Sequence, residues 1–362
     1  MRSSATPETY PEPAIRAIDA LFERAGLTRS LRGKAGVPAD RPSSAGWKAG
    51  LPGRMRFEQT ARQELIPPAP RVAPNGVQWL AAPGWEKTGW LWHGFSTRCG
   101  GLSRAYCSDS AQGELNLGFT ADDDRETVAA NRRLLVEAIS GNPATPLVTL
   151  RQIHSNRVVL ASAAEASREP LVKADGLITD APGLLVGVQT ADCIPILVAD
   201  RKRRVVAAFH AGWRGTVKRI VESGVGRMRL AFGSRPEDLI AAIGPGIGPC
   251  CYAVGDEVVS SFESQFAYAG ELFREVSDSD PVRAKYPMLF LTQRAPGHSE
   301  IGSGLHLDLV EANRRQLLDA GLKPKAIKVI GGCTSCQPEF FFSHRASQGR
   351  AGRMMSVIGI RP

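Results

Sequence analysis

The chain of 362 residues lacks the features of several protein classes. It has no run of about 18 apolar residues, so we expect no membrane-spanning helix. Its first part has no continuous apolar core of the kind that a secretory signal needs. Its seven cysteines are an odd number, and together with the missing signal they predict a reducing, cytoplasmic compartment. The glycine-rich stretch 244–249 lacks the Gly-Lys-Ser/Thr ending of a phosphate-binding P-loop.

The charge pattern of the chain argues against nucleic-acid and membrane binding. The formal net charge is +9, but the basic residues are scattered among acids, without a stripe or interleaved aromatic residues. We therefore expect neither nucleic-acid nor membrane binding, whereas a small anion such as phosphate needs only one or two arginines. We expect a monomer or a small homo-oligomer.

Composition changes divide the chain into two parts. Residues 1–75 are predicted to be an N-terminal extension, with one short amphipathic helix over 11–26 and a flexible linker rich in Arg, Pro, Gly and Ser after it. Residues 76–362 are predicted to be the catalytic domain. Its many short strand-like runs and few helices predict a single α/β (α+β) domain of mixed sheets flanked by helices.

The expected elements follow from apolar periodicity and from turn and capping residues. Strands are predicted over 77–80, 89–98, 147–153, 158–161, 173–180, 184–188, 194–198, 205–209, 239–243, 340–345 and 354–360. Helices are predicted from a capping box at Thr120–Asp123 to Gly141, from Arg214 through Met228, and over 306–320.

His154, Cys193 and His210 each lie at the end or turn of an apolar, β-branched run. A sheet protein can aim side chains from such positions into one cleft. Imidazole and thiolate ligands together suit zinc, and three protein ligands leave a fourth tetrahedral position open for water or substrate. By residue type alone, however, a buried thiol and hydrogen-bonded core histidines explain the pattern more simply.

An ordered set of short sequence motifs favours the metal site over the simpler interpretation. In chain order the sequence contains HGFSTRCGGLS, LNLG, QIHSNRV, TADCIPILVAD, HAGWRG, IGPGIGPCCYAVGDEV and FFSHRASQGRAGRM. From roughly Trp79 to Ile360 the chain thus closely resembles the laccase-domain family, once called polyphenol oxidases and now regarded as zinc-dependent purine nucleoside phosphorylases. One departure is His344, which stands where the family usually has a tyrosine.

The resemblance implies a fold akin to that of toxin-type cysteine hydrolases. It also implies zinc ligands at His154, Cys193 and His210, phosphorolysis of adenosine, inosine, guanosine and methylthioadenosine, and adenosine deamination in the same site. The partners would be purine nucleosides and inorganic phosphate. Bound zinc would lower the pKa of a water and polarise substrate oxygens.

Four further residues are candidate substrate contacts. Arg98 belongs to the phrase that borders the active site in the resembling family, where its guanidinium can hold phosphate, although a surface arginine is an equal alternative. Asn116 precedes a glycine turn and has either a ligand-binding or a structural role. Gln152 shares a strand face with His154, and Arg214 lies at a predicted helix N-terminus, where anions bind.

Asp192 directly precedes the proposed thiolate ligand. A carboxylate there can take part in catalysis by receiving a proton or orienting a ligand, and it would repel the thiolate unless a cation lies nearby. The alternative is a cap on the turn.

Two other enzyme classes fit the same residues. Two histidines and a cysteine also describe a blue-copper centre, which makes copper the alternative to zinc. However, the chain has only six histidines and no methionine near Cys193 or His210 in sequence. A cysteine hydrolase would use Cys193 as nucleophile and His154 or His210 as base.

Cys333 and Cys336 form a Cys-x-x-Cys pair. With Cys250 and Cys251 this pair could make a four-thiolate structural zinc site, or it could be redox-active. The resemblance implies neither role, so we interpret the four as mostly reduced, buried thiols.

Overall fold

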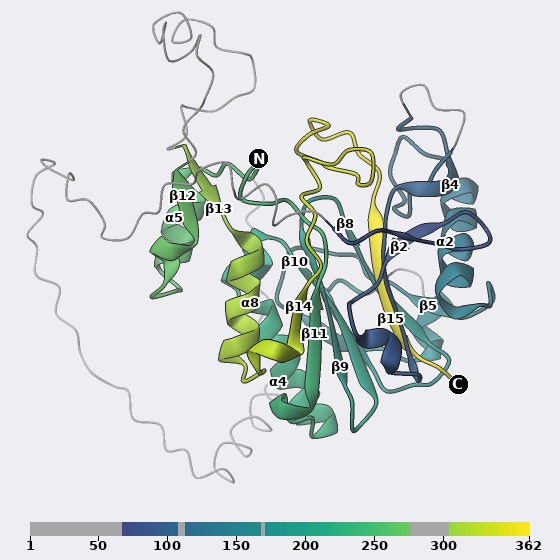
Figure 1. Cartoon of the computed structure of the whole chain (residues 1–362), viewed down its shortest axis with the longest axis horizontal. Coiled ribbons are helices and arrows are strands. Elements are labelled where there is room, and N and C mark those ends of the chain that lie inside the picture. The colour runs from purple at the N-terminus through teal and green to yellow at the C-terminus, as the bar shows by residue number, and fades with distance from the viewer. Residues whose placement is uncertain (1–66, 108–112, 168–170, 276–303) are drawn as a thin grey trace, which may run out of the picture. The chain divides into compact units, whose positions relative to one another are not determined.

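The computed structural model describes residues 67–107, 113–167, 171–275 and 304–362 (Figure 1). The helix expected over 11–26 lies outside these residues, as does the linker up to residue 66. Two six-stranded mixed sheets form the described structure, and a two-stranded sheet accompanies them.

The first sheet has the strand order β1-β2-β3-β15-β8-β5. Its pairs are antiparallel except for the parallel pair of β5 with β8. The strands are β1 Arg71–Val72, β2 Gln78–Leu80, β3 Leu91–Ser96, β15 Met354–Ile360, β8 Leu185–Thr190 and β5 Leu147–Val148.

The second sheet has the order β14-β11-β9-β10-β7-β6. Its outer pairs, β14 with β11 and β7 with β6, are parallel, and its central pairs are antiparallel. The strands are β14 Ile327–Val329, β11 Leu239–Ile243, β9 Ile194–Asp200, β10 Val205–Ala211, β7 Gly176–Thr179 and β6 Val158–Leu160.

Helices and short elements complete the described structure. The α-helices are α2 Arg125–Ser140, α3 Trp213–Val217, α4 Ile220–Phe232, α5 Asp256–Glu263 and α8 Leu309–Asp319. The remaining strands are β4 Cys99–Ser103, β12 Phe273–Glu275 and β13 Leu305–Leu307, of which the last two pair with each other. Short 3-10 helices lie at Trp85–Lys87, Ala163–Ser167, Pro236–Asp238, Ala269–Glu271 and Pro324–Ala326.

The elements stack in four layers, with α2 outside the first sheet and α4 and α8 outside the second (Figure 1). Successive residues of β9 and β10 alternate between two cores. Ile196 and Phe209 pack against the helices, whereas Leu197 and Ala208 pack between the sheets. Because both faces of these strands are buried, their sequences are continuous apolar runs. The predicted fold class, one α/β domain of mixed sheets flanked by helices, is confirmed.

Three helix predictions need correction. The helix expected from Arg214 through Met228 is two helices, because the chain breaks at Arg219, whose φ of 60° is left-handed. The helix expected over 306–320 begins only at Leu309, since Leu305–Leu307 forms β13 and the side chain of Asp308 caps the helix. The helix before Gly141 is present, but its cap is Asp124 rather than Thr120–Asp123.

The strand predicted over 340–345 is wrong. This segment is a loop of turns in which Phe341 and Phe342 are buried between the sheets. A short buried apolar run does not by itself distinguish a strand from a loop that is anchored by its side chains.

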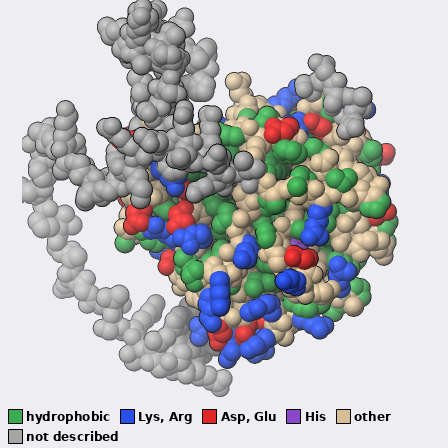
Figure 2. Space-filling model, in the orientation of Figure 1, with side chains coloured by type: hydrophobic (Ala, Val, Ile, Leu, Met, Phe, Trp, Pro, Cys, Tyr) green, Lys and Arg blue, Asp and Glu red, His purple; other side chains and the backbone are tan. Residues whose placement is uncertain are grey.

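No helix among the described residues is long and apolar enough to cross a membrane. On the face drawn in Figure 2, Lys and Arg side chains are interspersed with Asp and Glu. The absence of nucleic-acid binding stays a prediction.

Candidate metal centre

Three segments that are distant in sequence bring His154, Cys193 and His210 together. His154 lies in the turn before β6, Cys193 lies in the connection that crosses from β8 of the first sheet to β9 of the second, and His210 lies near the end of β10. One ligand atom from each residue lies within 4.8 Å of the other two. The Sγ of Cys193 is 3.9 Å from Nε2 of His154, and the two imidazole rings meet edge to face at 4.9 Å between centroids.

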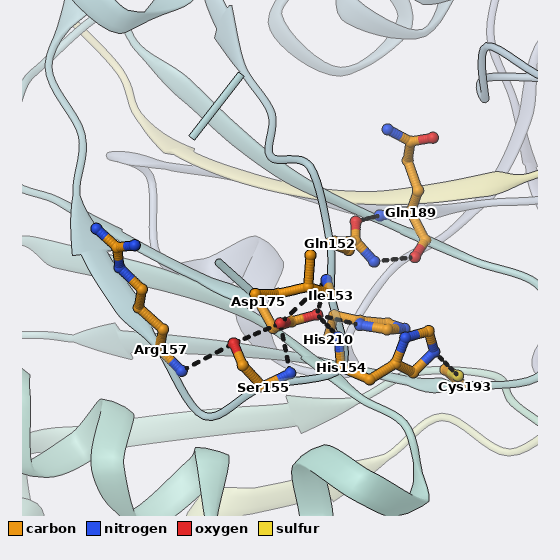
Figure 3. Close-up of polar contacts among 9 residues, drawn as sticks. All are labelled: Gln152, Ile153, His154, Ser155, Arg157, Asp175, Gln189, Cys193 and His210. Carbon is orange, nitrogen blue, oxygen red and sulfur yellow. Dashed lines mark hydrogen bonds and ion pairs between the residues drawn. The ribbon is translucent and has the colours of Figure 1, made fainter. Parts of the chain in front are cut away.

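Asp175 organises two of these three residues (Figure 3). It is fully buried and directly precedes β7. Its Oδ1 lies 2.9 Å from Nδ1 of His210, and it accepts hydrogen bonds from the backbone N–H groups of Ile153, His154 and Ser155 and from the Ser155 hydroxyl. One carboxylate thus fixes the turn that carries His154 and turns the Nε2 of His210 toward Cys193.

The turn that holds His154 and the connection before Cys193 both contain left-handed backbone at a non-glycine residue. His154 has φ 57° and Asp192 has φ 92°. Such conformations persist only where surrounding contacts impose them, and they gather at functional sites. Asp175 holds the first, and the second is held because Asp192 accepts hydrogen bonds from the Thr334 hydroxyl at 2.6 Å and the Arg345 N–H at 2.7 Å.

The charges of the site favour a cation. Burial by itself would raise the pKa of the Cys193 thiol, but the charge of His210 and hydrogen bonds to His154 and His210 lower it to about 6. Burial would lower the pKa of His210, but the Cys193 thiolate and Asp175 raise it to about 9. Although burial opposes it, hydrogen bonds from His210 and Ser155 hold the pKa of Asp175 below its usual range. A metal ion can replace the proton that the thiolate and imidazole otherwise share.

The donor set and its geometry fit a zinc ion. Two imidazole nitrogens and one thiolate are ligands that zinc accepts, and a carboxylate behind one histidine is the usual outer partner of such a ligand. His154 is exposed, Cys193 is half-buried and His210 is buried. The site is therefore open on one side, where a fourth ligand can enter.

A cavity of about 400 Å³ lies on that open side. Its walls include all three candidate ligands together with Gln152, Gln189, His344 and Arg353. The amide of Gln152 pairs with the backbone of Gln189 in both directions, at 2.7 Å each (Figure 3). The Nη1 of Arg353 donates to the carbonyls of Ala351 and Gly352.

The other residues predicted to contact substrate do not line this cavity. Arg98 is not among the residues that line this cavity. It pairs with Glu114, donates to the carbonyls of Pro338 and Tyr106, and lies over the ring of Phe342. Its part in phosphate binding stays a prediction.

Asn116 and Arg214 also lie away from the cavity lining. Asn116 is fully buried, bonds to Gly118 and Asp123, and accepts from the backbone N–H of Arg353. Its contacts therefore position Arg353, and ligand binding by Asn116 stays a prediction. Arg214 is exposed and lies over the ring of Trp213.

Three residues of this site were not predicted from the sequence. The sequence does offer a hint of the role of Asp175, because an acidic residue between the apolar Ala174 and a strand is unusual unless its carboxylate is hydrogen-bonded or ion-paired. Gln189 and Arg353 belong to or adjoin the quoted phrases, but nothing in their spacing indicates that β8 and β15 bring them to the same cavity.

Comparison with known proteins identifies the family of the chain. The model of the family described as multi-copper polyphenol oxidoreductase laccase matches residues 92–361. The purine nucleoside phosphorylase YlmD of Geobacillus stearothermophilus is 36% identical over 290 residues, which are 76% of this chain and 96% of that protein. The purine nucleoside phosphorylase YfiH of Escherichia coli K12 is 32% identical, over 77% of this chain and 98% of that protein.

A solved structure extends the likeness to the fold. The crystal structure of YlmD from Geobacillus stearothermophilus matches with a TM-score of 0.64 and 32% identity, over 82% of this chain and all of that one. The resemblance seen in the sequence is thus confirmed. The chain belongs to the laccase-domain family, in which its curated relatives are named purine nucleoside phosphorylases.

Proposed function

We propose that this protein is a zinc-dependent purine nucleoside phosphorylase that also deaminates adenosine at the same site. The observation that carries the proposal is the convergence of His154, Cys193 and His210, with Asp175 behind His210, in the wall of a cavity of about 400 Å³. The names of the relatives support the reaction class. Zinc at these ligands would supply a Lewis acid and a water of lowered pKa.

The surrounding residues have separate tasks in this proposal. Arg353 brings a guanidinium to the cavity wall, where it can hold phosphate. Gln189 and Gln152 form a rigid polar wall that can position the nucleoside. His344 lies at the exposed rim, at the position where the family usually has a tyrosine, and offers an imidazole in place of a phenol.

The donor set favours zinc over copper. A blue-copper centre usually adds a weak axial methionine to two histidines and a cysteine. Among the described residues that line the cavity there is no methionine. Metal analysis together with absorption spectroscopy distinguishes the two ions, since only copper gives an intense thiolate band in the visible range.

The test is a product assay on zinc-loaded protein. With inosine or adenosine and phosphate we expect hypoxanthine or adenine and ribose 1-phosphate, and with adenosine alone we expect inosine and ammonia. His154→Ala should lower both activities at least about 100-fold, whereas Arg353→Met should mainly raise the KM for phosphate. Cys107→Ser, away from the cavity, is the matched control. Activity that is unchanged in His154→Ala would refute the proposal.

A second candidate is a cysteine hydrolase. It is favoured by one observation: Cys193, His210 and Asp175 have the arrangement of nucleophile, base and orienting carboxylate. The two candidates differ in what zinc does. If zinc protects Cys193 from alkylation by an electrophile and activity rises with zinc, the thiolate is a ligand. If alkylation proceeds equally in zinc-loaded protein and abolishes activity, it is a nucleophile.

A further inference from the structure

Four of the seven cysteines gather at a second place, outside the cavity described above. Cys250 and Cys251 lie in a turn after β11, and Cys333 and Cys336 lie in a turn after β14. Their four sulfur atoms all lie within 4.8 Å of one another. All four are free thiols, but only Cys333 is buried, so the expectation of four buried thiols is wrong for the other three.

We propose that these four cysteines bind a second, structural zinc ion as a tetrathiolate. The sulfur of Cys336 is 3.5 Å from that of Cys250 and 3.3 Å from that of Cys251. Tetrahedral coordination with zinc–sulfur bonds of about 2.3 Å separates neighbouring sulfurs by about 3.8 Å. A disulfide needs about 2.05 Å. The observed separations are therefore close to those around one ion and well beyond those of a covalent pair.

The two turns present their sulfurs as metal-binding loops do. The N–H of Cys251 donates to the carbonyl of Gly248, and that of Cys336 donates to the carbonyl of Cys333. Because the chain turns at 249–251, the side chains of two adjacent cysteines point to one side, which an extended strand would forbid. The N–H of Gly248 donates to the sulfur of Cys333 at 3.2 Å, a contact that stabilises a bound thiolate.

Four neighbouring thiolates repel one another without a cation between them. Zinc binding would form four zinc–sulfur bonds and release the thiol protons to solvent, with no change in oxidation state. A thiophilic divalent ion is thus the class of ligand that this cluster fits.

The position of the cluster gives the ion a structural task. The two turns are joined by the pairing of Gly246 with Cys333 and by the bond from Thr334 N–H to the Gly246 carbonyl. The N–H of Ile247 and the hydroxyl of Thr334 both donate to Asp192, the residue before Cys193. An ion that locks the turns together would thereby hold the connection that carries a ligand of the first site.

The decisive measurement is zinc bound per chain, in full-length protein that is reduced, stripped and reloaded. We expect about two ions in the parent and in Cys107→Ser, and about one in Cys251→Ser, Cys336→Ser and Cys193→Ser. The double variant Cys193→Ser/Cys251→Ser should bind none. Far-UV circular dichroism establishes that each variant is folded.

Cobalt provides a readout that does not depend on activity. The Cys193→Ser variant loaded with cobalt should show the strong visible bands and the near-ultraviolet thiolate band of a tetrathiolate. These bands should be absent from the double variant Cys193→Ser/Cys251→Ser. This measurement decides the question even if Cys336→Ser does not fold.

A folded Cys336→Ser variant that binds as much zinc as the parent would overturn the proposal. So would a Cys193→Ser variant without bound metal, a disulfide within the cluster of the reduced and reloaded chain, or an iron–sulfur absorption spectrum. Failure of the phosphorylase assay leaves these stoichiometries untouched, so the two proposals are tested separately.

Discussion

Gly212 lies against the candidate metal ligands, so replacing it with alanine tests whether they act as a set. A Cβ added at this position would lie 2.9 Å from Sγ of Cys193 and 3.0 Å from Cδ2 of His154. The backbone itself accepts alanine, since φ is −74° and ψ is 171°. The perturbation is therefore steric and is directed at the two ligand side chains.

The expected size of the effect follows from these distances. Non-bonded heavy atoms prefer separations of about 3.5–4.0 Å, so Cys193 and His154 must retreat by about 0.5–1 Å. A metal site tolerates about 0.2 Å in its bond lengths. Misplaced ligands of this kind weaken metal binding by about 10–100-fold, which corresponds to about 1.4–2.7 kcal/mol.

The assay is competition for zinc against a chromophoric chelator, with thermal unfolding of the stripped protein measured beside it. Gly212→Ala should lose zinc affinity at the first site while its Tm without metal stays close to that of the parent. Gly226→Ala in α4 is the matched control, because nothing lies within 4 Å of its added Cβ. That variant should keep its zinc affinity and gain up to about 1 kcal/mol in stability. Gly212→Ala protein that binds zinc within about twofold of the parent would show that Cys193 and His154 do not bind the ion together.

Three further predictions concern buried residues. Asp175→Asn should weaken zinc binding at the first site about 10–100-fold and lower the free energy of unfolding by about 3 kcal/mol, because one carboxylate bonds both to His210 and to the turn that carries His154. Chelator competition measures the first effect and equilibrium unfolding the second. Unchanged values in both assays would contradict the role assigned to Asp175. Burial lowers the pKa of His93 to about 4, and its Nε2 accepts a hydrogen bond from the N–H of Ala82. As the pH falls below about 6.5, His93 therefore becomes protonated in the unfolded chain but stays neutral in the folded chain. Stability should drop by about 2 kcal/mol between about pH 7.5 and pH 5 in urea titrations, and a His93→Gln variant with an equal drop would exclude His93 as the source. Gly224→Ala should cost about 1–3 kcal/mol of unfolding free energy, because its Cβ would overlap the fully buried ring of Phe209; a stability equal to that of Gly226→Ala would show that α4 moves aside without cost.

The sequence predicted best where burial dictates the pattern. The strands β9, β10 and β11 are continuous apolar runs because cores lie on both of their faces, and their predicted positions agree with the structure to within two residues. The proximity of the three metal-ligand candidates was also predicted, although from an ordered set of phrases rather than from spacing. No local spacing joins a turn before β6 to a connection between two sheets.

The sequence predicted least where tertiary contacts override local preference. The break between α3 and α4 has no glycine or proline to mark it. Arg219 is held in a left-handed conformation by Glu222, by the carbonyl of Gln265 and by the ring of Phe266. Arg353 was missed for a similar reason, since its place in the cavity depends on the pairing of β15 with β8 and on the buried side chain of Asn116.

The carboxylates of Asp192 and Asp175 differ in whether they contact a candidate metal ligand directly. Asp192 was expected to receive a proton or to orient a ligand beside the thiolate, and this role stays a prediction. Its oxygens bond to Thr334 and Arg345, which ties the connection that carries Cys193 to the last loops of the chain. Asp175 bonds directly to the ring of His210. The left-handed residues His154 and Asp192 would relax if these contacts were lost, because local sequence does not favour their conformation. The geometry of the candidate metal centre therefore depends on contacts from both sheets and from the last loops of the chain.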